Sequence, residues 1–436
     1  MFRGAGALAT AARRDAGRDT RRPAVNRTRI IVPAALVLLV APGLRAEPQA
    51  VRVELRAGRH DRTATPIAMP LPKALAGAQF VALLREDTGR SVPAEVVPGP
   101  APQVVWLVRG TLPAGKSRTY RLTKRIPLPK IVKPHVAVHD DRKTLTVRVD
   151  GRRVLVYNQA VVPSPDPKSP YYRRSGHIHP LLTPGGVTVT ADFAPDHPHQ
   201  HGVMFPWTRT RFRGQKTEFW NQKLRLGTVE HVRTPATGSG QVLGHFTVVL
   251  GHVALKVTGG PTTVLNETWH VRVYRRTDGF LLDLVSTQTC ATREPLEILK
   301  YHYGGMAIRC RADWIDTGNF LTSAGRTRKD GNHTRARWCD IHGPVGKTSA
   351  GATLMCHPAN FRFPQPVRLH PSKPYFCFAP MVLGPFKIAP DKPYVSRYRF
   401  FVHDGKPDAK RIEALWHDYA DPPEAKLLPP RRPVHL

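Results

Sequence analysis

Apolar and polar residues alternate along most of the chain, and a period of two is typical of β-strands with one buried face. In residues 47–125 the alternating runs are short and are broken by Pro and Gly. They read VRVEL, QFVALLRE, SVPAEVVP, QVVWLVRG and SRTYRLTK. We therefore expect a small N-terminal β-sandwich, followed by a stiff Pro-spaced linker at residues 126–134.

The same period continues through residues 135–425, which predicts a second and larger β-domain. Asp150 and Gly151 separate two of its runs, and this dipeptide is a strong β-hairpin signal. Many antiparallel strands without alternating helices imply two large sheets packed face to face. The predicted fold class is mostly β: a large antiparallel β-sandwich with a smaller N-terminal β-domain and a short C-terminal helix.

The helix is expected near the end of the chain. Asp408 can cap the segment AKRIEALWHDYA, whose apolar stripe is formed by Ile412, Leu415, Trp416 and Tyr419. The last residues, 426–436, are rich in Pro and Arg and are expected to form a tail.

Residues 1–46 read as a secretory signal. An arginine-rich lead precedes an apolar run, Ile30 to Leu44, that is too short for a comfortable membrane span. Cleavage is expected near Ala46, so the mature chain would be exported, to the periplasm or outside the cell, without a transmembrane span. An N-terminal membrane anchor is the alternative.

The chain is strongly basic, with a formal net charge of +34. Residues 1–46 hold nine Lys and Arg against two Asp, so their removal leaves +27. Such a field favours anionic partners. The basic residues are dispersed, without a basic helix, an RNP-type motif or zinc-finger spacing, which argues for acidic glycans over nucleic acid. A merely solvated basic surface is the alternative.

Five cysteines lie between residues 290 and 377, without a CxxC pair. They could form at most two disulfides, or they could be buried free thiols.

The stretch 196–221 concentrates the groups that could perform chemistry. Three histidines at i, i+2 and i+4 would leave one face of an extended segment: His197, His199 and His201. Pro198 removes a ladder donor, so we expect this segment at an edge, a bulge or a loop rim. With Glu218 or Asp192 the histidines would form an open N/O site for zinc, iron or copper. Acid–base chemistry, substrate binding and a structural role are the alternatives.

The same stretch contains three alternating arginines, Arg209, Arg211 and Arg213. On a strand they would line one face, where they could bind carboxylates or sulfates, or could protect an edge strand with charge. Trp207 and Trp220 could stack on sugars or belong to the core. Further polar clusters are His177 with His179, Tyr301-His302-Tyr303, His333 with Arg335 and Asp340, His357 with Asn360, and His403 with Asp404.

An ordered series of motifs resembles the DUF6807 family, whose members often carry the label methane oxygenase PmoA. The motifs are Tyr171–Pro184, Asp196–Gly202, Glu218–Asn221, Tyr301–Met306, His357–Asn360, His403–Gly405 and IEALW, and the resemblance covers roughly Val136 to Ala420. Gln200 departs from the family pattern, because relatives commonly carry a histidine there. The methane label does not fit, since a methane monooxygenase membrane subunit needs several long apolar spans.

The resemblance implies an exported carbohydrate-utilisation protein, similar to the galactose-mutarotase supersandwich, in which a histidine and a carboxylate work on a sugar ring. We expect the protein to bind and process a sugar, possibly an acidic one, by acid–base chemistry. The expected catalytic residues are His199, His201, Glu218 and His302. The expected substrate-binding residues are His177, His179, Arg209, Arg211, Trp220, Asn221, Arg335, His357 and Asn360.

Two other functions stay open. A non-catalytic glycan-binding protein would keep its tryptophans and arginines exposed. A metal-dependent oxygenase or lyase would use a divalent metal ion held by His197, His199 and His201.

Overall fold

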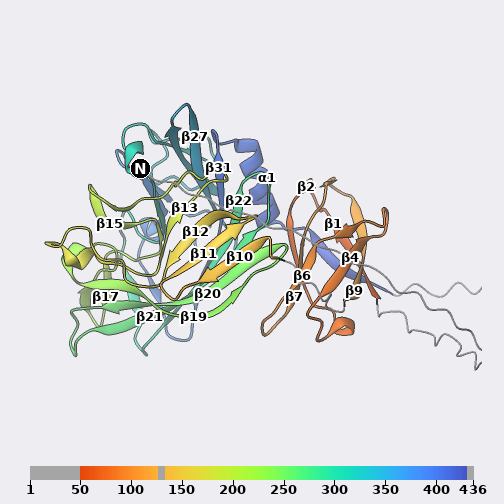
Figure 1. Cartoon of the computed structure of the whole chain (residues 1–436). Helices are drawn as coiled ribbons and strands as arrows, with labels where there is room; N and C mark the ends of the chain where they lie inside the picture. Colours follow the sequence, from red (N-terminus) through yellow and green to blue (C-terminus); the bar gives the residue numbers. More distant parts are fainter. Residues whose placement is uncertain (1–49, 126–132, 430–436) are drawn as a thin grey trace, which may run out of the picture. The chain divides into compact units, whose positions relative to one another are not determined.

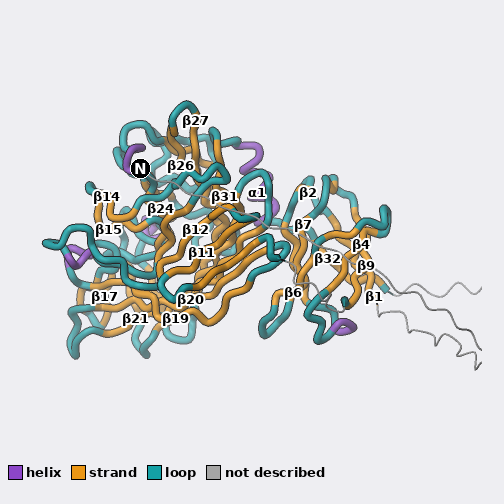
Figure 2. The backbone as a smooth tube through the Cα atoms, in the orientation of Figure 1, coloured by secondary structure: helices purple, strands orange, loops and turns teal. Residues whose placement is uncertain are grey.

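A computed structural model describes residues 50–125 and 133–429 (Figures 1 and 2). The expected signal peptide with its cleavage site lies outside the described residues, as do most of the expected linker and the end of the expected tail. The described residues form mostly strands, arranged in large antiparallel sheets with one C-terminal α-helix, which confirms the predicted fold class. Within these residues no helix has the length and apolar character needed to cross a bilayer.

The first strands build a small sandwich from a five-stranded sheet (β32-β1-β9-β4-β5), a three-stranded sheet (β3-β7-β6) and the pair β2-β8. Their bounds are β1 (Ala50–Arg56), β2 (Arg62–Thr63), β3 (Pro66–Pro70), β4 (Val81–Arg85), β5 (Ser91–Val92), β6 (Ala94–Val97), β7 (Gln103–Leu107), β8 (Thr111–Leu112) and β9 (Ser117–Lys124). The buried, alternating residues of these strands form their own core around Trp106 and Tyr120.

One strand of this sandwich comes from the other end of the chain. β32 (Glu424–Leu428) pairs antiparallel with β1, and Leu428 lies opposite Arg52. Residues 426–428 therefore belong to a sheet, although the sequence assigned them to a tail. Ala425 packs against the apolar core of the sandwich, and this contact explains why the segment returns.

The larger sandwich has two eight-stranded sheets. The first contains, in spatial order, β10 (Val136–Asp140), β11 (Thr144–Val149), β12 (Arg152–Asn158), β13 (His177–Leu181), β16 (Val203–Met204), β24 (Met306–Arg309), β29 (Tyr375–Phe378) and β28 (Val367–Leu369). The second contains β19 (Gly227–Gly238), β20 (Leu243–Ala254), β21 (Thr262–Tyr274), β22 (Phe280–Cys290), β31 (Tyr394–Asp404), β27 (Thr348–Cys356), β26 (Trp338–Val345) and β25 (Asn319–Thr322). Inward-facing residues of both sheets share one hydrophobic core.

The predicted hairpin between β11 and β12 forms as expected. Asp150 and Gly151 both have positive φ angles, 47° and 82°, as a tight two-residue turn that matches the strand twist requires.

Two small sheets complete the larger sandwich. β14 (Asp192–Ala194) pairs with β15 (His197–His201), and a four-stranded sheet has the order β18 (Gln215–Thr217), β17 (Thr210–Phe212), β23 (Leu296–Ile298), β30 (Phe386–Ile388). The register of β14 and β15 shifts between Asp192 and Ala194. The segment around Pro198 thus lies in a short, irregular strand pair, in agreement with the expected edge or bulge.

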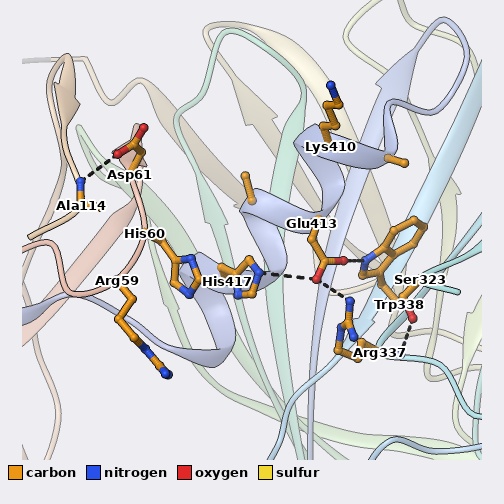
Figure 3. Close-up of a pocket in the computed structure, with 12 residues that line it drawn as sticks. Arg59, His60, Asp61, Ala114, Ser323, Arg337, Trp338, Lys410, Glu413 and His417 are labelled. Atoms are coloured by element: carbon orange, nitrogen blue, oxygen red, sulfur yellow. Dashed lines mark hydrogen bonds and ion pairs between the residues drawn. The ribbon is translucent and has the colours of Figure 1, made fainter.

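Helix α1 (Ala409–Ala420) also agrees with its prediction. The side chain of Asp408 accepts hydrogen bonds from the backbone of Lys410 and Arg411, which caps the helix. On the buried side Glu413 accepts hydrogen bonds of 2.6 Å from the Trp338 indole and from Arg337 (Figure 3).

Short 3-10 turns occur at η1 (Lys73–Leu75), η2 (Pro170–Tyr172), η3 (Gln222–Leu224), η4 (Ala312–Trp314) and η5 (Pro380–Leu383). All five cysteines are free thiols, and four of them are buried. Burial raises the pKa of the Cys356 thiol to about 12, so this side chain is an inert core residue.

Candidate functional site

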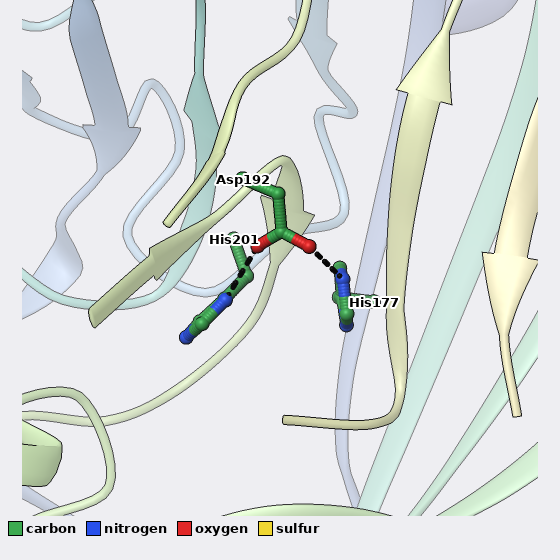
Figure 4. A group of neighbouring side chains, drawn as sticks. All are labelled: His177, Asp192 and His201. Carbon is green, nitrogen blue, oxygen red and sulfur yellow. Dashed lines mark hydrogen bonds and ion pairs between the residues drawn. The ribbon is translucent and has the colours of Figure 1, made fainter. Parts of the chain in front are cut away.

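The centre of the candidate site is a carboxylate held between two buried imidazoles (Figure 4). Asp192 Oδ1 lies 2.6 Å from His201 Nδ1, and Asp192 Oδ2 lies 2.9 Å from His177 Nε2. Both histidines are 0% exposed, whereas the Asp192 side chain retains 9% of its accessible surface. One ligand atom from each of the three residues falls within 4.8 Å of the other two.

Local strand pairing brings these residues together. Asp192 on β14 lies opposite His201 on β15, and the register shift next to Asp192 separates this pair from the rest of the ladder. His177 begins β13, where it pairs with Asn158 of β12. The site therefore joins the two-stranded sheet to the first large sheet.

Amide side chains contact both rings, His201 at its outer nitrogen and His177 at the nitrogen that faces Asp192. His201 Nε2 lies 2.8 Å from Gln222 Oε1, and the Gln222 amide nitrogen donates to the Arg173 carbonyl at 2.8 Å. Asn158 Nδ2 donates to the His179 carbonyl at 3.0 Å and lies 3.2 Å from His177 Nε2. Buried rings with such partners occupy a single orientation.

The electrostatics of the cluster favour an ionised aspartate. Burial opposes ionisation of Asp192, but the charge of His177 and the hydrogen bonds from both histidines hold its pKa far below the usual range. Burial lowers the pKa of His201 to about 4, against the opposing effect of Asp192. His201 is therefore a neutral imidazole near neutral pH.

A partly exposed row of side chains continues from the cluster along β15. His197 Nδ1 lies 2.9 Å from Asp196 Oδ2, and Asp196 receives both terminal nitrogens of the buried Arg309, at 2.6 Å and 3.1 Å. Arg309 also donates to Gln200, which explains how the glutamine at this position is used.

His199 lies on β15 between His197 and His201. No hydrogen bond to another described residue occupies its ring, which is 5.4 Å from the His197 ring. Burial, together with the nearby His197 and His201, lowers the pKa of His199 to about 3. His199 is thus a neutral and available imidazole.

His179 is the fourth histidine at the cluster. Its Nδ1 lies 3.0 Å from Thr190 Oγ1, and burial lowers its pKa against the attraction of Asp192. It comes from the motif that also supplies His177, and the substrate-binding role expected of both histidines stays a prediction.

Ring contacts join four motifs that are far apart in the sequence. Successive ring centroids lie within 4.6 to 6.5 Å of one another. The series runs through Tyr171, Tyr172, His199, His197, His370, Tyr375, Trp220 and Tyr303. We call this series the aromatic row.

The structure assigns Glu218 another role than the expected catalytic base. Its carboxylate accepts hydrogen bonds from the backbone N–H groups of Arg209, Trp220 and Asn221, at 3.0 to 3.2 Å. Burial raises its pKa, although these hydrogen bonds oppose the rise. Glu218 organises the loop before η3, and the carboxylate at the histidine cluster is Asp192.

Trp220 does not offer a surface for sugar stacking, because it is 0% exposed, as is Trp207. The expected stacking role of Trp220 is therefore wrong, and of the two alternatives for Trp207 the core position is the one found, since both rings belong to the core between the sheets. Asn221 exchanges hydrogen bonds with Tyr303, at 2.8 and 3.1 Å, and thereby fixes one end of the aromatic row.

The three alternating arginines do not share a strand face. β17 contains only Thr210–Phe212, and both flanking arginines have positive φ angles, 50° for Arg209 and 51° for Arg213. Arg209 lies over the Tyr301 ring, Arg211 is exposed in the middle of the strand, and Arg213 pairs with Glu294. The expected anion-binding face is therefore not formed.

The remaining predicted residues are distributed over other parts of the larger sandwich. His302 is exposed beside Tyr301, and its carbonyl lies 3.1 Å from His333 Nε2. Arg335 donates to three backbone carbonyls of residues 362–364. His357 contacts Tyr419 of helix α1, and Asn360 is buried against the Arg397 backbone. Their hydrogen bonds are those of residues that hold loops.

Several site residues carried no clear signal in the sequence. They are Asn158, Gln222, Arg309, His370 and Tyr375. Gln222 follows the Glu218–Asn221 motif directly, and that proximity was the one available sign. The others come from single polar or aromatic positions in strands or turns.

A second aspartate lies between two histidines elsewhere. Asp340 Oδ1 lies 2.9 Å from His342 Nδ1, and Asp340 Oδ2 lies 3.0 Å from His403 Nε2. Thr353 Oγ1 donates to Asp340 Oδ2 at 2.6 Å. Burial would lower the pKa of His403, but the hydrogen bond and charge of Asp340 raise it above its ordinary value.

Fold and site together define a two-sheet antiparallel β-sandwich protein that carries a buried His–Asp–His cluster at a short strand pair. The chain belongs to DUF6807, a family of unknown function, whose sequence model matches residues 144–417. The predicted family is thus confirmed. No curated protein matches the sequence.

Among solved structures, an alpha-mannosidase from Enterococcus faecalis matches with a TM-score of 0.41 and 10% identity, covering 87% of this chain and 46% of that chain. A glycosyl hydrolase family 38 protein from Enterococcus faecalis matches with a TM-score of 0.42 and 9% identity, covering 87% and 48%. A galactose mutarotase related enzyme from Lactobacillus acidophilus matches with a TM-score of 0.22 and 8% identity, covering 63% of this chain and 99% of that chain. The chain thus spans about half the length of the first two proteins. At such scores their activities do not transfer to this chain.

Proposed function

We propose that this chain is a carbohydrate-active enzyme that binds an acidic sugar at the histidine-rich face around Asp192 and acts on it by proton transfer. One observation carries the proposal. Two histidines from separate motifs, His177 and His201, hold one carboxylate, and next to them His199 keeps a neutral ring that contacts Tyr172.

The roles of the residues follow from their contacts. His199 has both ring nitrogens available, and His179 has Nε2 available once Nδ1 meets Thr190. A neutral imidazole can accept a proton during a reaction, and a lowered pKa means that it passes the proton on and does not hold it near neutral pH. The carboxylate of Asp192 is held by His177 and His201, so it stabilises positive charge that develops next to it. Epimerisation, lyase-type proton abstraction and hydrolysis each need such groups.

The substrate class follows from the ring surfaces and the charge. Tyr171 and His370 are partly exposed members of the aromatic row, and flat rings of this kind pack against sugar faces. The formal net charge of +34 attracts anionic partners over long range. A uronate-containing oligosaccharide combines both features.

The proposal is tested by measuring turnover and binding of uronate-containing and neutral oligosaccharides with the wild type and the His199→Gln variant. We expect turnover of the acidic substrates to fall at least about 100-fold with binding retained. His139→Gln, which changes an exposed histidine of β10, is the matched control. Binding without turnover by the wild type would instead identify a glycan-binding protein, and neither binding nor turnover would refute the proposal.

We also propose that the protein is exported through the signal predicted at residues 1–46. Mass spectrometry of protein from the periplasm or medium should give a mature N-terminus near residue 47. A full-length N-terminus in the membrane fraction would support the anchor instead.

A further inference from the structure

We propose that His177, Asp192 and His201 bind one divalent transition-metal ion. The proposal concerns the same site as the proposed function, but it does not depend on the substrate. It differs from the expected metal set in having His177 in place of His197 and His199; His201 and Asp192, one of the two carboxylates expected there, are common to both. Among the described residues this is the one group of His, Cys, Asp and Glu side chains whose ligand atoms converge in this way.

The spacing of the three ligand atoms suits a single ion. Metal–nitrogen and metal–oxygen bonds of about 2.1 Å place neighbouring ligand atoms about 3.0 to 3.4 Å apart at octahedral or tetrahedral angles. The two imidazole nitrogens lie 2.6 and 2.9 Å from the Asp192 oxygens, and all three groups fit within 4.8 Å. Small rotations of the rings would bring all three onto one ion.

Two groups face the same nitrogen of His177, the Asn158 amide and the Asp192 carboxylate. Asn158 Nδ2 donates to the His179 carbonyl, which fixes the Asn158 amide, and its second hydrogen faces His177 Nε2 at 3.2 Å. His177 Nε2 is then an acceptor that faces a carboxylate oxygen 2.9 Å away. The Nε2 lone pair and the carboxylate oxygen repel each other at this distance unless a proton or a metal cation lies between them, and a metal ion would take the place of both the proton and the Asn158 contact.

His201 has the outer contact that a ligating histidine normally has. The Arg173 carbonyl fixes the Gln222 amide, so Gln222 Oε1 accepts the proton of His201 Nε2. That contact leaves Nδ1 as the atom directed at Asp192. Metal-binding histidines usually donate their other N–H group to an oxygen in this manner, which fixes the tautomer and orientation.

The donor set indicates the class of metal. Two imidazole nitrogens and one carboxylate oxygen suit Zn²⁺, Fe²⁺ or a neighbouring first-row ion and leave positions open. Ca²⁺ and Mg²⁺ prefer sets made of oxygen ligands. The remaining surface of Asp192 lies on the side of a partly exposed face, from which a small ligand could complete the coordination.

The first experiment uses purified full chain from which metal has been removed with a chelator. Zn²⁺ is added, and bound metal is measured by calorimetry and elemental analysis; Co²⁺ is added separately and followed by visible and X-ray absorption. We expect about one ion per chain, with nitrogen and oxygen ligands and no sulfur. No saturable binding by the folded wild type would overturn the proposal.

Variants then locate the ion. Asp192→Asn and His201→Gln should lose stoichiometric binding, and Gln222→Leu should weaken it about 10- to 100-fold. His403→Gln, at the other His–Asp–His cluster, should bind as the wild type does. Undiminished binding by a folded His201→Gln protein would refute the site. If the ligand variants do not fold, the Co²⁺ spectra of the wild type and of Gln222→Leu test the site instead. Identical spectra and affinities in these two proteins would refute it.

The metal measurement and the sugar assays give separate answers. A bound metal without any sugar turnover or binding would refute the proposed function alone. Sugar turnover by protein without a metal, unchanged by a chelator, with no saturable Zn²⁺ binding, would refute the metal site alone.

Discussion

Two aspartates of this chain lie between pairs of histidines, and the two clusters differ in what surrounds them. At Asp192 the nitrogens converge on one region, and the amide side chains of Gln222 and Asn158 contact the two rings. At Asp340 a threonine hydroxyl supplies a further hydrogen bond, and His403 also donates to the backbone. Two clusters of the same residue types thus differ in the convergence of their ligand atoms and in their neighbouring groups, and our proposal assigns the cation to the one at Asp192.

The pKa values of the histidines also differ between the two clusters. The pKa of His403 is raised, because the hydrogen bond and charge of Asp340 favour the imidazolium form of this ring. The pKa of His201 is lowered to about 4, so Asp192 faces a neutral ring. The Asp340 cluster is therefore expected to stabilise the fold, and the Asp192 cluster to bind and act.

The largest expected effect is stabilisation by metal. Zn²⁺ at about 1,000 times its dissociation constant should raise the free energy of unfolding of the chelator-treated wild type by about 4 kcal/mol. His403→Gln should show the same increment and His201→Gln none. Chemical denaturation with and without Zn²⁺ measures it. If Zn²⁺ raised the free energy of unfolding equally in both variants, the metal site could not be assigned to the Asp192 cluster.

The next effect concerns the buried ion pair. Asp340→Ala should lower the free energy of unfolding by about 3 to 5 kcal/mol, because it leaves His403 without its counter-charge in the interior. Asp316→Ala, at an exposed position, is the control and should change it by less than about 0.5 kcal/mol. Urea unfolding provides the comparison, and equal values for the two variants would show that the Asp340 pair contributes nothing.

A smaller effect is expected from the hydroxyl that distinguishes the second cluster. Thr353→Val removes the 2.6 Å hydrogen bond to Asp340 and should cost about 1 to 2 kcal/mol. Zn²⁺ binding should not change. A fall in metal affinity in this variant would mean that the clusters are energetically coupled.

The smallest effect is a pH dependence. Because the pKa of His403 is raised on folding, its contribution to stability is complete below its unfolded pKa of about 6.5 and is lost as pH rises through the folded value. Wild-type stability should therefore decline above about pH 6.5 more steeply than that of His403→Gln. Parallel curves for the two proteins would contradict the assignment of charge to His403.

Much of the fold could be predicted from local patterns. Alternation located the long strands, Asp150-Gly151 located a hairpin, and Asp408 located the start of helix α1. These features depend on neighbouring residues in the sequence, so a single sequence contains them. β32 could not be predicted, because its partner β1 lies more than 300 residues away and its own pattern is weak.

The candidate site could be predicted only in part. The histidine-rich motifs were visible, but the choice of Asp192 over Glu218 depends on a register shift and on side-chain directions that no short pattern specifies. The alternating arginines suggested one longer strand, but Arg209 and Arg213 have positive φ angles, so the strand is short and has a turn at each end. Burial of Trp220 follows from contacts with distant segments, which its neighbours do not reveal.

The pairing of β1 with β32 also orders events during synthesis. β1 can pair with β32 only after almost the whole chain has been synthesised. Until then one edge of β1 is open to other strands. A protein shortened at its C-terminus would thus be damaged at its N-terminal sheet, and the small sandwich expressed from residues 47–125 alone would carry a permanent sticky edge.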